Sequence, residues 1–267
     1  MKKLSVLAIA FAAIAFAACG GKKNVQNEDA TDSLKTFEQT QIEAGIKMHF
    51  DSIAAELATL KQLPFLQEGN GGLTLTKAEK QVKPDYLVSP SIAEEATTLA
   101  EKYRALAALN VDKKIAELYE MPVEDYDKAV TKLAADINDP SFKAIEDAGT
   151  LYETSTTLYD SMNENGRINY FWQLASAAMV EQLYIASQNS EKFLSVFNDE
   201  AADKVTYRVI LILDALNRLS VYDPEIKPVS EALAPLDVLN ATTVSELKSQ
   251  IAEAKDKIAA ARKALVN

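Results

Sequence analysis

Apolar residues recur at spacings of three and four along most of this 267-residue chain. The clearest stripe lies near the C-terminus, where Leu247, Ile251, Ile258 and Leu265 fall on one side of a helix. A period near 3.6 indicates amphipathic helices, and no stretch shows the sustained period-two alternation of a strand. Glycine, which disfavours helices, is scarce at 8 residues. We therefore expect an all-α fold, a bundle of about seven or eight helices in one domain spanning residues 33–267.

Capping patterns predict where several of these helices begin. A hydroxyl residue followed three positions later by Glu can close a capping box. The pattern occurs at Ser91–Glu94, Thr150–Glu153 and Thr243–Glu246. The first of these helices should run to about Leu109, with at most a brief interruption at 110–112.

One predicted helix, 198–222, carries more large apolar residues than the others. Its main stripe is Val205, Val209, Ile212, Leu216 and Leu219, and Ile210, Leu211 and Leu213 lie on other faces. A helix that is apolar nearly all round belongs in the centre of a bundle. We therefore expect this helix to be the central one.

The N-terminal segment has the organisation of a secretory signal peptide. Lys2 and Lys3 precede an apolar run, Leu4–Phe16, which is too short for the roughly 20 residues of a membrane span. Small residues then lead to Cys19, the only cysteine. The segment resembles the bacterial lipobox, which implies that residues 1–18 are removed and that Cys19 is lipidated. The alternative is ordinary cleavage, which would leave a soluble periplasmic chain with a spare thiol.

The residues after the cysteine bear on location. Residues 19–32 are polar and aperiodic, as expected for a flexible tether. Gly20 is not acidic, and by resemblance to lipoprotein sorting this favours the outer membrane, with the membrane face left open. The membrane is then contacted through the lipid on Cys19. The formal net charge of −11 argues against nucleic acid and anionic lipid surfaces as partners.

Several short sequence stretches between Tyr86 and Asn189 resemble those of a group of helical lipoproteins from Bacteroidota. They include Tyr86-Leu87-Val88-Ser89-Pro90 and Glu181-Gln182-Leu183-Tyr184-Ile185-Ala186. The resemblance implies a helical fold and an envelope location, and it brings no activity. Three Asp-Ser tripeptides resemble the O-glycosylation sequon of the same bacteria, although Asp-Ser is also ordinary helix-cap chemistry. Their serines are Ser33, Ser52 and Ser161.

The sequence shows no recognised motif for metal binding, nucleophilic catalysis or phosphate binding. His49 is the only histidine, so it has no histidine partner for a metal site, and we expect a partly buried structural role. There is no Gly-x-Ser-x-Gly elbow and no Gly-rich phosphate loop. We therefore expect no cofactor, no metal and no enzymatic activity.

Glu181 is the most unusual residue, because it falls on the apolar face of the 167–189 helix. A charge on such a face must be paired or shift its pKa. Arg208 or Arg218 on a later helix could supply the partner. We consider a polar pocket inside the bundle, and the alternatives are a structural ion pair or a Glu at the edge of the apolar stripe. The pocket would be formed by Glu181, Tyr184, Trp172 and Arg208, with Tyr170 near its mouth.

Three functions fit these observations. The first is a protein-binding or scaffolding lipoprotein that contacts another envelope protein. The second is a carrier of a small ligand or lipid with a pocket inside the helical bundle. The third is a hydrolase that uses carboxylates alone, because two acids can hydrolyse sugars without histidine. The oligomeric state stays open.

Overall fold

The fold is that of a computed structural model, which describes residues 47–56, 63–66, 72–142 and 155–266. The described residues are helical with no strand, so the all-α class is confirmed. None of the described helices has the length and hydrophobicity of a membrane span. The signal segment, the tether and the Thr150–Glu153 capping pattern lie outside the described residues.

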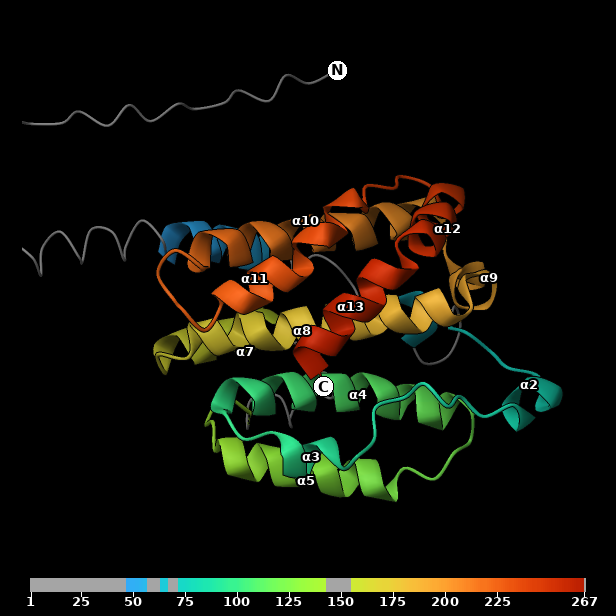
Figure 1. The fold of residues 1–267 in the computed structure, drawn as a ribbon, viewed down its shortest axis with the longest axis horizontal. Helices are drawn as coiled ribbons and strands as arrows, with labels where there is room; N and C mark the ends of the chain where they lie inside the picture. The colour runs from blue at the N-terminus through green and yellow to red at the C-terminus, as the bar shows by residue number, and fades with distance from the viewer. Residues whose placement is uncertain (1–46, 57–62, 67–71, 143–154, 267) are drawn as a thin grey trace, which may run out of the picture. The chain divides into compact units, whose positions relative to one another are not determined.

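The central helix is α8 (Ile168–Gln188), on which most of the other long helices pack (Figure 1). Its middle is buried on nearly every side, and the small residues Ser176, Ala177 and Ala178 leave room for neighbouring backbones. The helices that contact it include α4 (Leu99–Leu118), α7 (Ser155–Glu164), α10 (Asp199–Leu219), α12 (Val244–Glu253) and α13 (Lys255–Val266).

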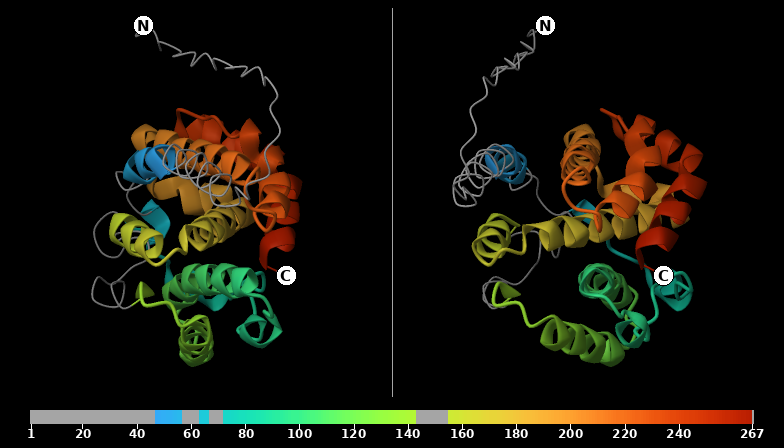
Figure 2. Two further views of the ribbon diagram at one scale, coloured as in Figure 1. Left: turned by 90° about the vertical axis from the view of Figure 1, so that its left-hand side faces the viewer. Right: turned by 60° about the vertical axis from the view of Figure 1, so that its left-hand side comes forward.

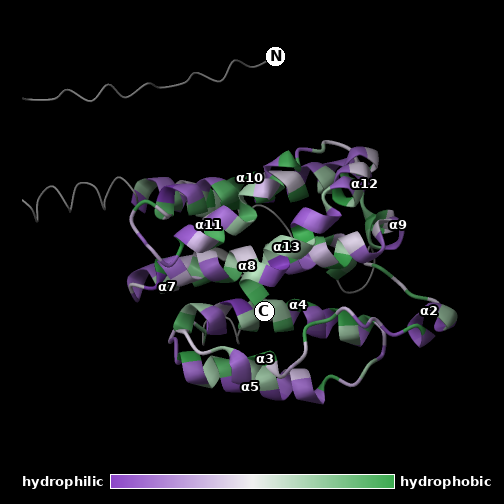
Figure 3. Cartoon of the chain, viewed as in Figure 1, coloured by the Kyte–Doolittle hydropathy of each residue, from purple (hydrophilic) through white to green (hydrophobic). Residues whose placement is uncertain are grey.

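The prediction that the 198–222 helix lies at the centre was wrong. The predicted stripe of α10 is buried, but Ile210 is 48% exposed, and Asp214 and Arg218 pair on the outer side. Hydrophilic and hydrophobic segments alternate along its ribbon (Figure 3). Charged groups keep one side of α10 in water, because burying them there would cost more than its extra Leu and Ile residues gain.

The predicted start of the first long helix was also wrong. Ser91 makes no cap hydrogen bond, and α3 (Ile92–Glu95) ends after one turn. The capping box is formed by Thr98 and Glu101 at the start of α4. From there α4 runs without interruption through residues 110–112. A second capping box, at Thr76, opens the short helix α2 (Lys77–Gln81).

Helix α5 (Glu124–Ile137) packs on α4 away from α8, as all views show (Figures 1 and 2). Tyr126, Leu133 and Ile137 are buried on one face of this helix. The helix ends at Asn138, whose φ of 49° is the left-handed cap conformation that Asn tolerates.

The single predicted C-terminal helix is divided at Ala254 into α12 and α13. Its capping box at Thr243 is confirmed, and its apolar seam is buried inside this domain, with α13 packed on α8, α4 and α11 (Lys227–Leu233). The remaining elements are short: η1 (Pro64–Leu66), α9 (Ser190–Phe193), η2 (Leu194–Val196) and η3 (Ala234–Val238).

Candidate functional site

Glu181 is fully buried on α8, and its partner is Arg262 of α13. The Nε of Arg262 donates to both carboxylate oxygens of Glu181, at 3.0 and 2.8 Å. The cation is therefore neither of the two arginines that the sequence suggested. Arg218 instead donates to Asp214 within α10. Arg262 reaches Glu181 because it flanks the buried seam of α13, which packs against α8.

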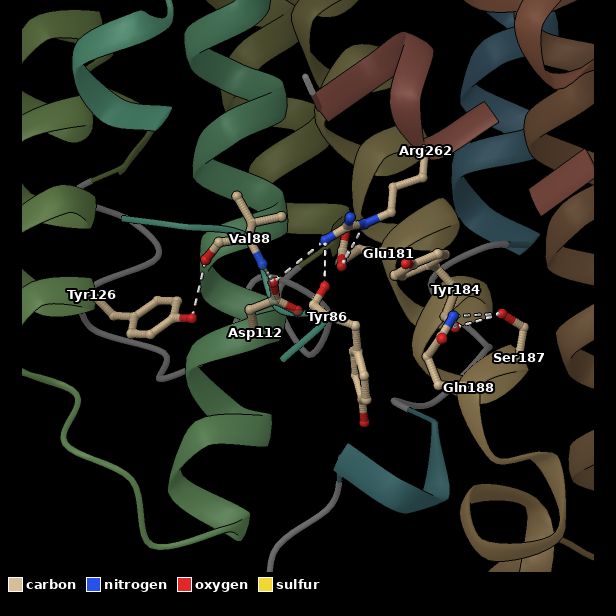
Figure 4. Close-up of polar contacts among 9 residues, drawn as sticks. All are labelled: Tyr86, Val88, Asp112, Tyr126, Glu181, Tyr184, Ser187, Gln188 and Arg262. Carbon is tan, nitrogen blue, oxygen red and sulfur yellow. Dashed lines mark hydrogen bonds and ion pairs between the residues drawn. The ribbon is translucent and has the colours of Figure 1, made fainter. Parts of the chain in front are cut away.

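A second buried acid, Asp112 of α4, completes this group (Figure 4). Its Oδ2 accepts a hydrogen bond from the backbone N–H of Val88 at 2.5 Å and lies 4.0 Å from Nη2 of Arg262. We call Asp112, Glu181 and Arg262 the buried charge cluster. Its members come from three different helices, so the cluster exists only when α4, α8 and α13 are packed together.

The buried charge cluster also fixes the backbone of residues 86–88. Nη2 of Arg262 donates to the carbonyl oxygen of Tyr86 at 3.1 Å, while Asp112 accepts from Val88 N–H. The hydroxyl of Tyr126 on α5 donates to the carbonyl oxygen of Val88 at 3.0 Å (Figure 4). Three side chains from three helices therefore satisfy the polar groups of a segment that has no regular structure of its own.

Aromatic rings close one side of the cluster. The guanidinium carbon of Arg262 lies 4.1 Å from the ring centroid of Tyr184, a cation–π contact. Tyr184 in turn meets Tyr86 edge to face, with ring centroids 6.4 Å apart. Both carboxylates are fully buried, whereas the Arg262 side chain is 13% exposed.

Burial dominates the electrostatics of the cluster. It raises the pKa of Asp112 well above its ordinary value, and the nearby charge of Glu181 adds to the effect. Burial also raises the pKa of Glu181, but Arg262 opposes that shift. Burial, with Asp112 and Glu181 nearby, raises the pKa of Tyr126 to about 12. At neutral pH we therefore take Glu181 as the anion that pairs with Arg262.

The structure brings together only part of the predicted pocket. Glu181 and Tyr184 share the contact with Arg262 described above. Trp172 is fully buried nine residues earlier, about 13 Å along α8, against Phe50, Tyr159 and Phe171. Arg208 is buried on α10. Tyr170 stacks on Tyr103, with ring centroids 4.9 Å apart.

Sequence reasoning missed Asp112 and Arg262. A signal existed for Asp112, because it lies three residues from both Leu109 and Ile115, which are buried on the same helix. The sequence instead predicts a possible interruption at 110–112. Arg262 gave no comparable signal, since an arginine beside an apolar seam is common on any amphipathic helix.

The other predicted residues lie away from the cluster. His49 is partly exposed, and its Nε2 lies 3.0 Å from Oδ2 of Asp214 on α10. Ser52 is exposed and Ser161 is partly buried, while Ser33 and Cys19 lie outside the described residues. Within the described ranges, no group of three His, Cys, Asp or Glu side chains is placed to hold a metal ion.

The chemistry open to the cluster is limited by access. Asp112 and Glu181 are two neighbouring acids, as a carboxylate hydrolase requires, but both side chains have zero exposure. A substrate could reach neither while α4, α8, α13 and residues 86–88 are packed around them. The arrangement supports a structural role in joining helices.

A scan against protein-family models and searches of curated proteins and of solved structures found no match to this chain.

Proposed function

We propose that this chain is an outer-membrane lipoprotein, anchored through Cys19, that binds another envelope protein and has no catalytic activity of its own. The anchor is supported by the signal segment and the lone cysteine that follows it. The binding role is supported by one observation, the exposed apolar side chains on α10 and in the turn that follows it. We call Tyr207, Ile210, Val221 and Tyr222 the α10 surface.

The α10 surface has the composition of a protein contact. Tyr207 and Ile210 are three residues apart and so are neighbours on one side of the helix. Val221 and Tyr222, in the turn that follows, are 76% and 57% exposed. Aromatic side chains such as tyrosine are enriched in interface cores. Since the chain carries a net charge of −11, the partner that fits best presents an apolar face within a basic rim.

The anchor is tested by fractionation. In cells that export the chain, Cys19→Ala should move it from the outer-membrane fraction to the soluble periplasm, and incorporation of labelled fatty acid should stop. Continued membrane association of Cys19→Ala would overturn the anchoring proposal.

The binding role is tested with a photo-crosslinking residue at Tyr207 or Ile210 in the lipidated chain. The matched control is Lys128, an exposed position on α5. We expect a discrete protein adduct from α10 only, which Val221→Ser or Tyr222→Ser weakens. Equal adducts from both positions would contradict a specific site. A lipid or small molecule that copurifies stoichiometrically would favour the carrier function instead.

A further inference from the structure

The buried charge cluster has unequal charges. Two carboxyl groups, Asp112 and Glu181, face one guanidinium, that of Arg262, and both acids are sealed from solvent. If both acids were ionised, the cluster would carry a net negative charge in a low-dielectric interior, which is costly. One carboxyl group must therefore hold a proton for the cluster to be neutral.

The hydrogen bonds indicate where that proton lies. Both oxygens of Glu181 are occupied by Arg262. On Asp112, Oδ2 accepts from Val88 N–H, whereas no described N–H or O–H group donates to Oδ1, which is buried. A proton on Oδ1 would let Asp112 donate to Glu181 and would leave no polar atom of the pair unsatisfied.

We propose that Asp112 carries this proton and shares it with Glu181, so that the cluster is a pH-sensitive clasp for residues 86–88 that opens when the proton is lost. Loss of the proton places a second negative charge beside Glu181. The released charge can be solvated only if the 86–88 segment moves away from α4 and admits water. The Val88 amide, which binds Asp112 directly, then becomes exposed.

Among the described residues, the groups that act on the pair supply one positive charge for two carboxyl groups. The charged and titratable side chains that act on the cluster or on Tyr86 come from the segment itself and from α4, α5, α8 and α13. They are Asp85, Tyr86, Asp112, Tyr119, Tyr126, Glu181, Tyr184 and Arg262. Among these, Arg262 is the one cation.

The direction of the pH effect follows from where the proton binds. Burial raises the pKa of Asp112 in the folded state, so the closed clasp binds a proton that an opened, solvated Asp112 releases above about pH 4. The clasp is therefore most stable in acid and loosens as pH rises, until the pH passes the raised pKa. One proton released per opening changes the opening equilibrium about tenfold per pH unit in this range.

Infrared spectroscopy of the full chain tests the proton directly. At neutral pH we expect the carbonyl band of a protonated carboxylic acid, which both Asp112→Asn and Glu181→Gln abolish, because one remaining carboxylate balances Arg262. Asp139→Asn is the matched control, since it alters another buried aspartate with its own donors, Tyr103 and Ser141 N–H, and should keep the band. If the unmodified chain lacks the band, the proposal is wrong whether or not the variants fold.

Hydrogen exchange tests the opening. The protection factor of the Val88 amide, which corrects its exchange for the intrinsic rate of an unfolded amide at each pH, should fall about tenfold per pH unit in the unmodified chain. In Asp112→Asn, whose amide reproduces the neutral acid, this protection factor should stay constant with pH. A constant protection factor in the unmodified chain would overturn the clasp.

Discussion

Replacing Arg262 with methionine tests the energetic role of the buried charge cluster. Methionine keeps an unbranched apolar stem and removes the charged guanidinium head. Glu181 then loses both of its 2.8–3.0 Å hydrogen bonds, and the carbonyl of Tyr86 loses its donor. Removing one member of a buried ion pair costs about 3–5 kcal/mol, because the other charge stays buried and unpaired.

That cost is a large share of the roughly 5–15 kcal/mol by which domains are stable. Urea unfolding of the full chain, followed by circular dichroism at neutral pH, should show a lower midpoint with an unchanged slope. In the variant, Glu181 has no cation to oppose the rise of its pKa by burial. The folded variant then binds a proton that the unfolded chain releases, so the loss of stability should become smaller as the pH is lowered.

A second substitution separates charge from packing. Adding Glu181→Met to Arg262→Met removes both charges, and apolar replacement of a whole buried pair is often neutral or stabilising. We therefore expect the double variant to recover most of the lost stability. A cost below about 1 kcal/mol for Arg262→Met, which is the range of a surface pair, would refute the reasoning. A double variant no more stable than the single one would refute it equally.

Three further predictions concern local structure. Gly166 has a φ of 67° and open space where a Cβ would stand. Gly166→Ala should therefore lower the free energy of unfolding by about 1–2 kcal/mol through backbone strain alone, and Gly166→Asn should lower it less. Equal losses for the two variants in thermal unfolding would argue against this. Thr98→Ala should cost about 1 kcal/mol by removing the cap of α4, whereas Ser91→Ala should stay within about 0.5 kcal/mol, and the reverse order in urea titrations would restore the cap predicted from sequence. The pKa of Glu101 is lowered to about 2 by hydrogen bonds from the backbone amides of Thr98 and Thr97 and from the Thr97 hydroxyl. The contribution of Glu101 to stability should therefore be complete above about pH 4.3 and lost as the pH falls towards 2. An NMR titration of its carboxyl carbon with a midpoint near pH 4 would contradict this prediction.

Local signals in the sequence were the most reliable guides to this fold. The capping box at Thr243 and the stripe of α10 both depend on spacings of three and four residues within a single helix. The Ser91 prediction failed even at this range. Ser91–Glu94 and Thr98–Glu101 match the same pattern, and only the second has a long helix behind it. A pattern of four residues cannot show which of two nearby caps the tertiary packing will use.

The choice of central helix required information that hydrophobicity alone does not contain. The 198–222 stretch has the larger apolar residues, whereas α8 has alanines and a serine that allow its neighbours to approach closely. Close packing rewards fit as well as apolar area, so a helix with small residues can be more completely buried than a more hydrophobic one.

In the buried charge cluster, the unusual position of Glu181 could be predicted from the sequence, but the residues that pair with it could not. Glu181 lies on an apolar face, and elementary electrostatics then requires a compensating group, so the existence of a partner followed from the sequence. Its identity did not, because the chain contains 28 Lys and Arg residues and the one used is 81 positions away on α13. Asp112 carries the same signal as Glu181, a carboxylate at three-residue spacing from buried apolar neighbours. Two such acids on different helices, taken together, would have predicted that the two helices meet around shared compensating groups.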